Sequence, residues 1–173
     1  MVGLGAKPKP GDTVLVTGAL GGVGRSAVFA AAEAGATVIA GVRARRLAEA
    51  KALPGVAQAV ALDDEAAIDA LPELDAVADT VGGELASRLI AKVRPGGRFG
   101  CFPSTRGAVG NRARVEVNSI FAQANPATTL RYAEAVRDGV LTIPIFGKRP
   151  LNEAGDAQAI AEAGVGGKIL LLP

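Results

Sequence analysis

Short apolar runs alternate with stretches of helical periodicity through the first part of the chain. The runs have the length and composition of buried strands. The predicted strands are Thr13–Thr17, Thr37–Val42, Gln58–Leu62, Ala76–Asp79 and Arg98–Phe102. Strands that are apolar on both faces and alternate with helices form parallel sheets covered on both sides. The pattern therefore predicts a single α/β domain built on a doubly wound parallel sheet.

Helices are predicted in the first three gaps between these strands. The first covers Val23–Ala34 and is ended by Gly35, because glycine readily takes the left-handed conformation of a helix C-terminus. The second covers roughly Ala44–Leu53, and a short acidic helix follows the third strand. The opening residues 1–11 are rich in Gly, Pro and Lys, so they are predicted to be a lead-in segment before a domain over residues 12–173.

The last third of the chain is less regular, and its pattern predicts a C-terminal tail of helices and strands. The expected order is a strand, a helix begun by proline, a short strand, a second helix and a final apolar run. These are Val115–Ala122, Pro126–Arg137, Ile143–Phe146, Leu151–Ala163 and Lys168–Leu172. An apolar strand near the edge of the sheet can pair with a second copy, so we expect a homodimer through Val115–Ala122.

Composition narrows the classes of function. The chain has 173 residues, of which 49% are hydrophobic, and a net charge of +2. It has no apolar run of about 20 residues and no signal-peptide profile, so we expect a cytoplasmic protein with no membrane or nucleic-acid partner. It has no histidine and one cysteine, Cys101. This excludes an internal disulfide, a Cys/His metal site and a histidine-dependent nucleophile within the chain.

The most informative segment is the glycine-rich stretch Val14–Gly24, which lies where the first strand turns into the first helix. In the dinucleotide-binding pattern G-x-G-x-x-G, the three positions are taken here by Ala19, Gly21 and Gly24. Gly21 leaves room for a pyrophosphate, Gly24 allows close helix packing, and the free N–H groups of the helix start attract phosphate. The turn predicts a Rossmann-type dinucleotide site, the alternative being only a tight strand-to-helix connection.

A second pattern fits the same letters. Thr17–Gly24 also matches the glycine motif of short-chain dehydrogenases. That family needs a catalytic Tyr-x-x-x-Lys, but the residue four positions after Tyr132, the single tyrosine, is Val136. The short-chain family is therefore set aside.

The choice of cofactor depends on the end of the second strand. An NAD site needs an acid there to bind the ribose hydroxyls, about 20 residues after the glycines. This chain has Arg43, Arg45 and Arg46 in that stretch and no carboxylate. Guanidinium groups bind a 2′-phosphate through charged hydrogen bonds. The segment therefore favours NADPH, the alternative being an ordinary basic helix start exposed to solvent.

Several motifs in register resemble the nucleotide-binding half of medium-chain dehydrogenase/reductases, in particular the zinc-independent quinone oxidoreductase and enoyl reductase branch. The resemblance covers nearly the whole chain from Gly11 onward. The motifs are Gly11–Gly24, Ala36–Ala40, Asp75–Gly83, Arg94–Arg98, Arg137–Pro144, Pro150–Ala154 and Gly167–Ile169.

The resemblance implies a set of cofactor-binding residues. The first turn would face the pyrophosphate, the arginines the 2′-phosphate, the turn after the fourth strand the nicotinamide ribose, and the residues after the fifth strand the nicotinamide. The full set is Ala19, Leu20, Gly21, Gly22, Val23, Gly24, Arg43, Arg45, Arg46, Thr80, Val81, Gly82, Phe102, Pro103 and Ser104.

Two departures from the family pattern bear on function. Family members carry an N-terminal barrel-like domain with the substrate pocket, which we expect this chain to lack, and Gln158 stands where the tail usually has a histidine. The resemblance implies hydride transfer to a quinone, an enone or another carbonyl compound, with substrate bound only when a catalytic domain is present. No catalytic residue is assigned. The alternative is a stand-alone or excised NADPH-binding module without catalysis.

Overall fold

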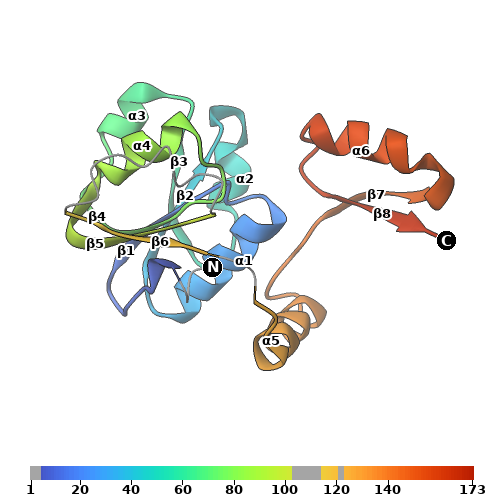
Figure 1. Cartoon of the computed structure of the whole chain (residues 1–173), viewed down its shortest axis with the longest axis horizontal. Helices are drawn as coiled ribbons and strands as arrows, with labels where there is room; N and C mark the ends of the chain where they lie inside the picture. The colour runs from blue at the N-terminus through green and yellow to red at the C-terminus, as the bar shows by residue number, and fades with distance from the viewer. Residues whose placement is uncertain (1–4, 103–113, 121–122) are drawn as a thin grey trace.

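The structure is a computed structural model that describes residues 5–102, 114–120 and 123–173. Its main body is a six-stranded parallel sheet in the order β3-β2-β1-β4-β5-β6 (Figure 1). The strands are β1 (Thr13–Thr17), β2 (Thr37–Val42), β3 (Val56–Ala61), β4 (Leu74–Ala78), β5 (Val93–Cys101) and β6 (Glu116–Ser119). This confirms the predicted doubly wound fold of the Rossmann type.

Helices cover both faces of this sheet. They are α1 (Gly22–Glu33), α2 (Leu47–Lys51) after the short 3-10 helix η2 (Ala44–Arg46), α3 (Glu65–Asp69) and α4 (Glu84–Ile90). Alternate strand residues pack into two separate cores. Val14 and Val16 of β1 lie in the core with α1 and α2, whereas Leu15 lies in the core with α3 and α4. The inner strands β1, β2 and β4 are therefore buried on both faces, which accounts for their nearly continuous apolar runs.

Most element boundaries agree with the sequence pattern. β1, β2 and the helix α5 (Pro126–Arg137) have the predicted bounds, and Gly35 after α1 has a φ of +77°. β5 begins earlier than predicted, because the turn at residues 95–97 lies within the strand and shifts its register against β4. The pattern predicted no separate helix at α4.

Residues 5–7 of the predicted lead-in segment lie against the sheet. Ala6 is fully buried, and Lys7 forms a 3.1 Å ion pair with Glu116 of β6. The backbone can approach this closely because Gly100 has no side chain; a Cβ there would lie 2.8 Å from the Ala6 nitrogen. β6 is the edge strand of the sheet, and residues 121–122 of the predicted strand lie outside the described part. The homodimer stays a prediction.

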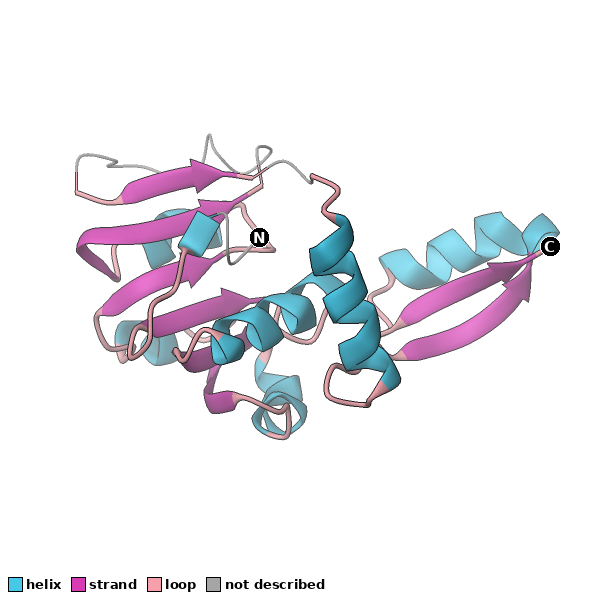
Figure 2. Cartoon of the chain, turned by 90° about the horizontal axis from the view of Figure 1, so that it is seen from below, coloured by secondary structure: helices cyan, strands magenta, loops and turns pink. Residues whose placement is uncertain are grey.

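The C-terminal tail forms a second, smaller unit. Beyond α5 come β7 (Ile145–Pro150), the 3-10 helix η4 (Leu151–Glu153), α6 (Ala154–Glu162) and β8 (Lys168–Leu172). β7 and β8 pair in parallel in a two-stranded sheet of their own, with α6 beside it (Figure 2). This β–α–β unit projects away from the main sheet, and its β7 side chains Ile145 and Phe146 are more than half exposed. Within the described ranges, no helix is long and apolar enough to span a membrane.

Candidate functional site

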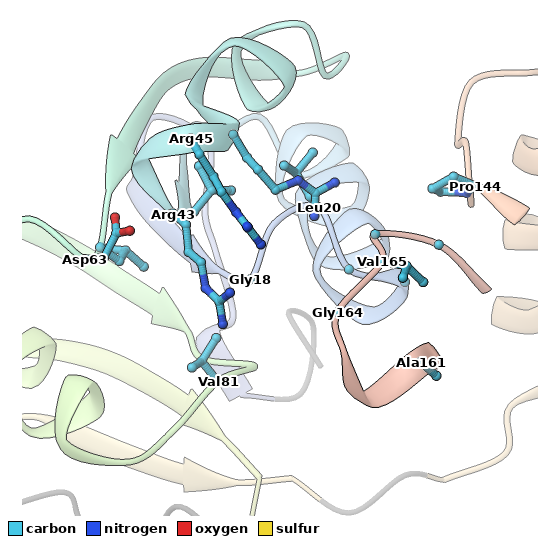
Figure 3. A pocket seen from close by; sticks show the side chains of 18 of the residues that line it. Gly18, Leu20, Arg43, Arg45, Asp63, Val81, Pro144, Ala161, Gly164 and Val165 are labelled. Atoms are coloured by element: carbon cyan, nitrogen blue, oxygen red, sulfur yellow. The ribbon is translucent and has the colours of Figure 1, made fainter. Parts of the chain in front are cut away.

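A pocket of about 500 Å³ lies between the carboxyl ends of the sheet strands and the C-terminal tail (Figure 3). Its walls come from the β1–α1 turn, the end of β2, the residues after β3, the β4–α4 turn and the loop between α6 and β8. The lining residues are Gly18, Leu20, Gly21, Gly22, Gly41, Val42, Arg43, Arg45, Arg46, Leu62, Asp63, Val81, Leu85, Ile143, Pro144, Ala161, Gly164, Val165, Gly166, Gly167 and Lys168. In parallel α/β sheets, ligands bind at this edge.

The β1–α1 turn is tight because its glycines have no side chains. Gly18 has a φ of +60°, and a Cβ on Gly24 would collide with the backbone of Gly18, so the helix start folds back directly on the turn. Gly21 caps α1 with a φ of −76°, and a Cβ there would lie 3.3 Å from the Gly18 carbonyl oxygen. Gly24 therefore serves packing, and Gly21 leaves space at the pocket wall.

The start of α1 is suited to an anion. It has no side-chain cap and no acidic residue in its first turn, so among the described residues no carboxylate of this turn offsets the positive end of its dipole. Lys168 lies beside this start: its Cε would be 3.0 Å, and its Nζ 3.6 Å, from a Cβ on Gly22. A cation and an uncapped helix start side by side attract a negatively charged group.

The three arginines differ in their partners. The Arg46 guanidinium binds both oxygens of Glu49 at 2.8 to 3.0 Å, and Glu49 also pairs with Arg25 at 3.1 Å. Arg43 and Arg45 form no ion pair with any residue in the described ranges. Their side chains extend into the pocket (Figure 3). Two unpaired guanidinium groups are therefore available to an anionic ligand.

Arg25 is a buried residue that binds the backbone of the β1–α1 turn. Its side chain is 9% exposed, and its Nε donates to the carbonyl of Leu20 at 3.2 Å. Burial lowers the pKa of the Arg25 guanidinium, while the nearby Glu49 carboxylate raises it. The buried guanidinium connects the glycine turn to α2 through Glu49.

An acidic residue also faces this pocket. Asp63 follows β3, and its Oδ1 accepts a hydrogen bond from the Ala44 amide at 2.7 Å. The sequence pattern leads one to expect a cofactor-binding acid only at the end of β2, so Asp63 is not among the predicted site residues. The sequence signal for it is its position directly after the predicted strand Gln58–Leu62. Because its Oδ1 binds the start of η2, Asp63 fixes the backbone that carries Arg43 and Arg45.

The pocket unites some of the predicted site residues and not others. It is lined by Leu20, Gly21, Gly22, Arg43, Arg45, Arg46 and Val81. Ala19 is fully buried beneath the turn, Val23 is 47% exposed, and Gly24 packs on Gly18. Thr80, Gly82 and Phe102 are described but do not line it, and Pro103 and Ser104 lie outside the described residues.

The C-terminal tail forms part of the pocket wall, and the sequence pattern did not predict this. Ile143, Pro144 and Ala161 line the pocket together with the loop 164–168. This loop faces the glycine turn in Figure 3. A Cβ on Gly166 would lie 3.0 Å from Nη2 of Arg46, so the loop also approaches the arginine segment closely. No local sequence signal marks such a contact, because the two segments are far apart along the chain.

The described residues offer little for metal or acid–base chemistry. They contain no group of three His, Cys, Asp or Glu side chains placed to hold a metal ion. The single cysteine, Cys101, is fully buried in β5. The arrangement can bind an elongated ligand with more than one negative group, and its own side chains supply charge and shape.

Comparisons with known proteins agree with this geometry. Residues 54–171 match the family model described as zinc-binding dehydrogenase. A search of the curated proteins finds no match.

Solved structures are similar over almost the whole chain. The quinone oxidoreductase from Coxiella burnetii is 28% identical with a TM-score of 0.85, covering 96% of this chain and 54% of that one. A cobalt- and zinc-bound thermostable alcohol dehydrogenase from Pyrobaculum aerophilum is 25% identical with a TM-score of 0.80, covering 97% and 52%. CurA from Vibrio vulnificus in complex with NADPH shares the fold, at 16% identity and a TM-score of 0.78, covering 98% and 59%. The chain thus spans somewhat over half the length of these proteins.

Proposed function

Because this chain belongs to the zinc-binding dehydrogenase family, within the medium-chain dehydrogenase/reductase superfamily, we propose that it is the NADPH-binding part of an oxidoreductase. One observation carries the proposal. The uncapped start of α1, Lys168 and the unpaired Arg43 and Arg45 all meet in one pocket at the carboxyl edge of a Rossmann-type sheet. A dinucleotide with a 2′-phosphate carries two separate negative groups: a pyrophosphate, which would match the start of α1 and Lys168, and the 2′-phosphate, which would match the two arginines.

The residues present fit such a cofactor. Gly21 and Gly22 would admit the pyrophosphate, because no side chain blocks the helix start. Lys168 would add positive charge beside the phosphates, because its side chain lies against the helix start at Gly22. Arg43 and Arg45 would bind the 2′-phosphate through charged hydrogen bonds, in a segment held by the Asp63 carboxylate.

The proposed reaction is reduction of a quinone, an enone or another carbonyl compound. When bound, NADPH supplies the hydride, and the protein contributes binding and orientation. The quinone oxidoreductase from Coxiella burnetii supports this class of substrate. We propose further that substrate is bound with the help of a catalytic domain, since the chain spans 54% of that protein.

The zinc in the family's name does not fit the described residues. Zinc sites in proteins use cysteine, histidine and carboxylate ligands close together. The sequence has no histidine and a single cysteine, and the described part holds no cluster of such ligands. The proposed reaction therefore includes no step at a metal held by this chain.

Calorimetric titration of the purified chain with NADPH and with NADH tests the proposal. A charged hydrogen bond contributes about 1.5 to 3 kcal/mol, so one or two arginines should give NADPH an affinity about 10- to 1000-fold higher. Equal affinities would contradict the assignment of the 2′-phosphate to the arginines. Absence of binding by both nucleotides would contradict the proposed function itself.

A further inference from the structure

Two side chains at the ends of β1 and β4 are joined in the interior of the protein. Thr17 and Asp79 are both fully buried, and the Thr17 hydroxyl donates to Oδ1 of Asp79 at 2.7 Å. The same hydroxyl accepts from the Thr80 amide at 2.8 Å, and the Thr80 hydroxyl donates to the Thr17 carbonyl at 2.7 Å. Three hydrogen bonds therefore connect the two strand ends.

The Asp79 carboxyl group also shapes the turn that follows it. Its Oδ1 accepts from the amides of Val81 at 3.2 Å and Gly82 at 3.1 Å, so the β4–α4 turn wraps around one oxygen atom. Val81 then lines the pocket. Gly82 and Gly83 follow with φ values of +77° and +70°. The path of this pocket wall is thus set from inside by Asp79.

The two turns approach closely only because of Gly18. A Cβ on Gly18 would lie 2.5 Å from Oγ1 of Thr80 and 3.2 Å from a methyl group of Val81. β1 and β4 are neighbours at the point where the strand order of the sheet reverses. Ligands of doubly wound sheets cross the sheet edge at this switch point.

This arrangement includes a feature that stability alone does not explain. The second carboxyl oxygen of Asp79, Oδ2, is buried and has no hydrogen-bond partner among the described residues. A buried acceptor without a partner destabilises the folded state. A pair of apolar side chains would fill the same space without that penalty, but they would not fix the turn.

We propose that Thr17 and Asp79 are positioning residues that lock the β1–α1 turn to the β4–α4 turn and thereby hold the nicotinamide half of the cofactor. The inference rests on the proposed function. In the proposed binding mode the adenine half would lie with the arginines that follow β2, and β2 is on the other side of β1 from β4. Loss of these hydrogen bonds should therefore weaken binding of the nicotinamide half of the cofactor and leave binding of the adenine half unchanged.

Two ligands and two variants separate this role from a general structural one. NADPH contains both halves of the cofactor, whereas 2′,5′-ADP contains only the adenine half with its 2′-phosphate. Thr17→Val has nearly the same shape but loses the hydroxyl, and Thr17→Ser keeps the hydroxyl as the matched control. Isothermal titration gives the affinity of each protein for each ligand, and thermal unfolding confirms that each is folded.

We expect Thr17→Val to bind NADPH about tenfold more weakly or worse, to bind 2′,5′-ADP within about twofold of the native value, and Thr17→Ser to restore NADPH binding. Equal losses for both ligands, or no loss for either, would overturn the inference. If Thr17→Val does not fold, Thr80→Val replaces it, because this change removes only the hydrogen bond to the Thr17 carbonyl. Thr80→Val should then lose affinity for NADPH and not for 2′,5′-ADP, and Thr80→Ser, the matched control, should bind both ligands as the native chain does.

The native chain separates this inference from the proposed function. If it binds NADPH and 2′,5′-ADP equally well, the nicotinamide half is not held and the positioning role is wrong, while NADPH binding stands. If it binds neither, the proposed function and the inference both fail.

Discussion

In the proposed function, the preference for NADPH over NADH depends on individual arginine side chains and on the partners that they already have. Arg46 is occupied by both oxygens of Glu49, whereas Arg43 and Arg45 have no ion-pair partner in the described ranges and extend into the pocket. A guanidinium that is already paired gains less from a new anion than one that is free. The segment after β2 thus offers two available cations where the sequence alone suggested three.

Replacing Arg43 tests this difference directly. Arg43→Ala should weaken NADPH about tenfold or more, since a charged hydrogen bond contributes about 1.5 to 3 kcal/mol, and leave NADH within about twofold. The matched control is Arg88→Ala, which removes one positive charge from α4, where Arg88 pairs with Glu65. Titration of both variants with both nucleotides gives the answer; a parallel loss in Arg88→Ala would mean that net charge, and not Arg43, is responsible.

The glycines of the first turn have different roles. Gly21 lines the pocket, and a Cβ on it would lie 3.3 Å from its nearest neighbour, the Gly18 carbonyl oxygen. A side chain on Gly24 would instead collide with the backbone of Gly18. Gly24 thus allows close packing, and we propose that Gly21 gives the ligand access to the helix start.

Two substitutions separate these roles. Gly21→Val should keep the fold and lose NADPH binding by more than about tenfold, because its methyl groups occupy the approach to the helix start. Gly24→Val should fail to fold or melt far below the native chain. Circular dichroism and titration measure both properties. Normal NADPH binding by Gly21→Val would show that the phosphates lie elsewhere.

At the scale of elements, the strands are tied together at their amino ends by Asp75 of β4. Its carboxylate accepts from the Thr13 amide of β1 at 2.8 Å and from Nε of Arg94 in β5 at 2.5 Å. The hydrogen bond from the Thr13 amide and then that from Arg94 hold the pKa of the Asp75 carboxyl below its usual value. Because its folded pKa is lower than its unfolded pKa, the ionised carboxylate stabilises the fold above the unfolded pKa. This contribution is lost as the pH falls through the folded pKa.

Asp75→Asn should therefore lower the free energy of unfolding at pH 7 by about 1 to 3 kcal/mol. The effect should be smaller at about pH 3, because part of this contribution is already lost there. Urea unfolding at both pH values measures this. Asp138→Asn is the control: Arg137 also lowers the pKa of Asp138, but the two are exposed sequence neighbours that stay close in the unfolded chain. An equal loss at both pH values in Asp75→Asn would rule out the ionised carboxylate as the cause.

The elements of the main sheet were predictable because their signals are local. Each of β1 and β2 is a short apolar run, and α5 begins at Pro126 behind Asn125, whose side chain caps the Thr128 amide. The turn inside β5 was not predictable as part of a strand, because its register shift depends on pairing with β4. Local sequence does not contain that information.

For the whole molecule, the sequence predicted one side of the pocket and missed the other. The glycine turn and the arginines follow strands directly, so their place at the carboxyl edge follows from the topology. The loop 164–168 lines the pocket only because β7, α6 and β8 fold into a separate unit, and this fold places the loop beside the start of α1. Such a contact depends on the tertiary fold, and periodicity does not report it.

A crystal structure of the chain with NADPH tests the central claim most directly. We predict the pyrophosphate at Gly21 and Gly22 with Lys168 beside it, and the 2′-phosphate in contact with Arg43 or Arg45. A cofactor bound elsewhere, or one with its 2′-phosphate away from both arginines, would contradict the account.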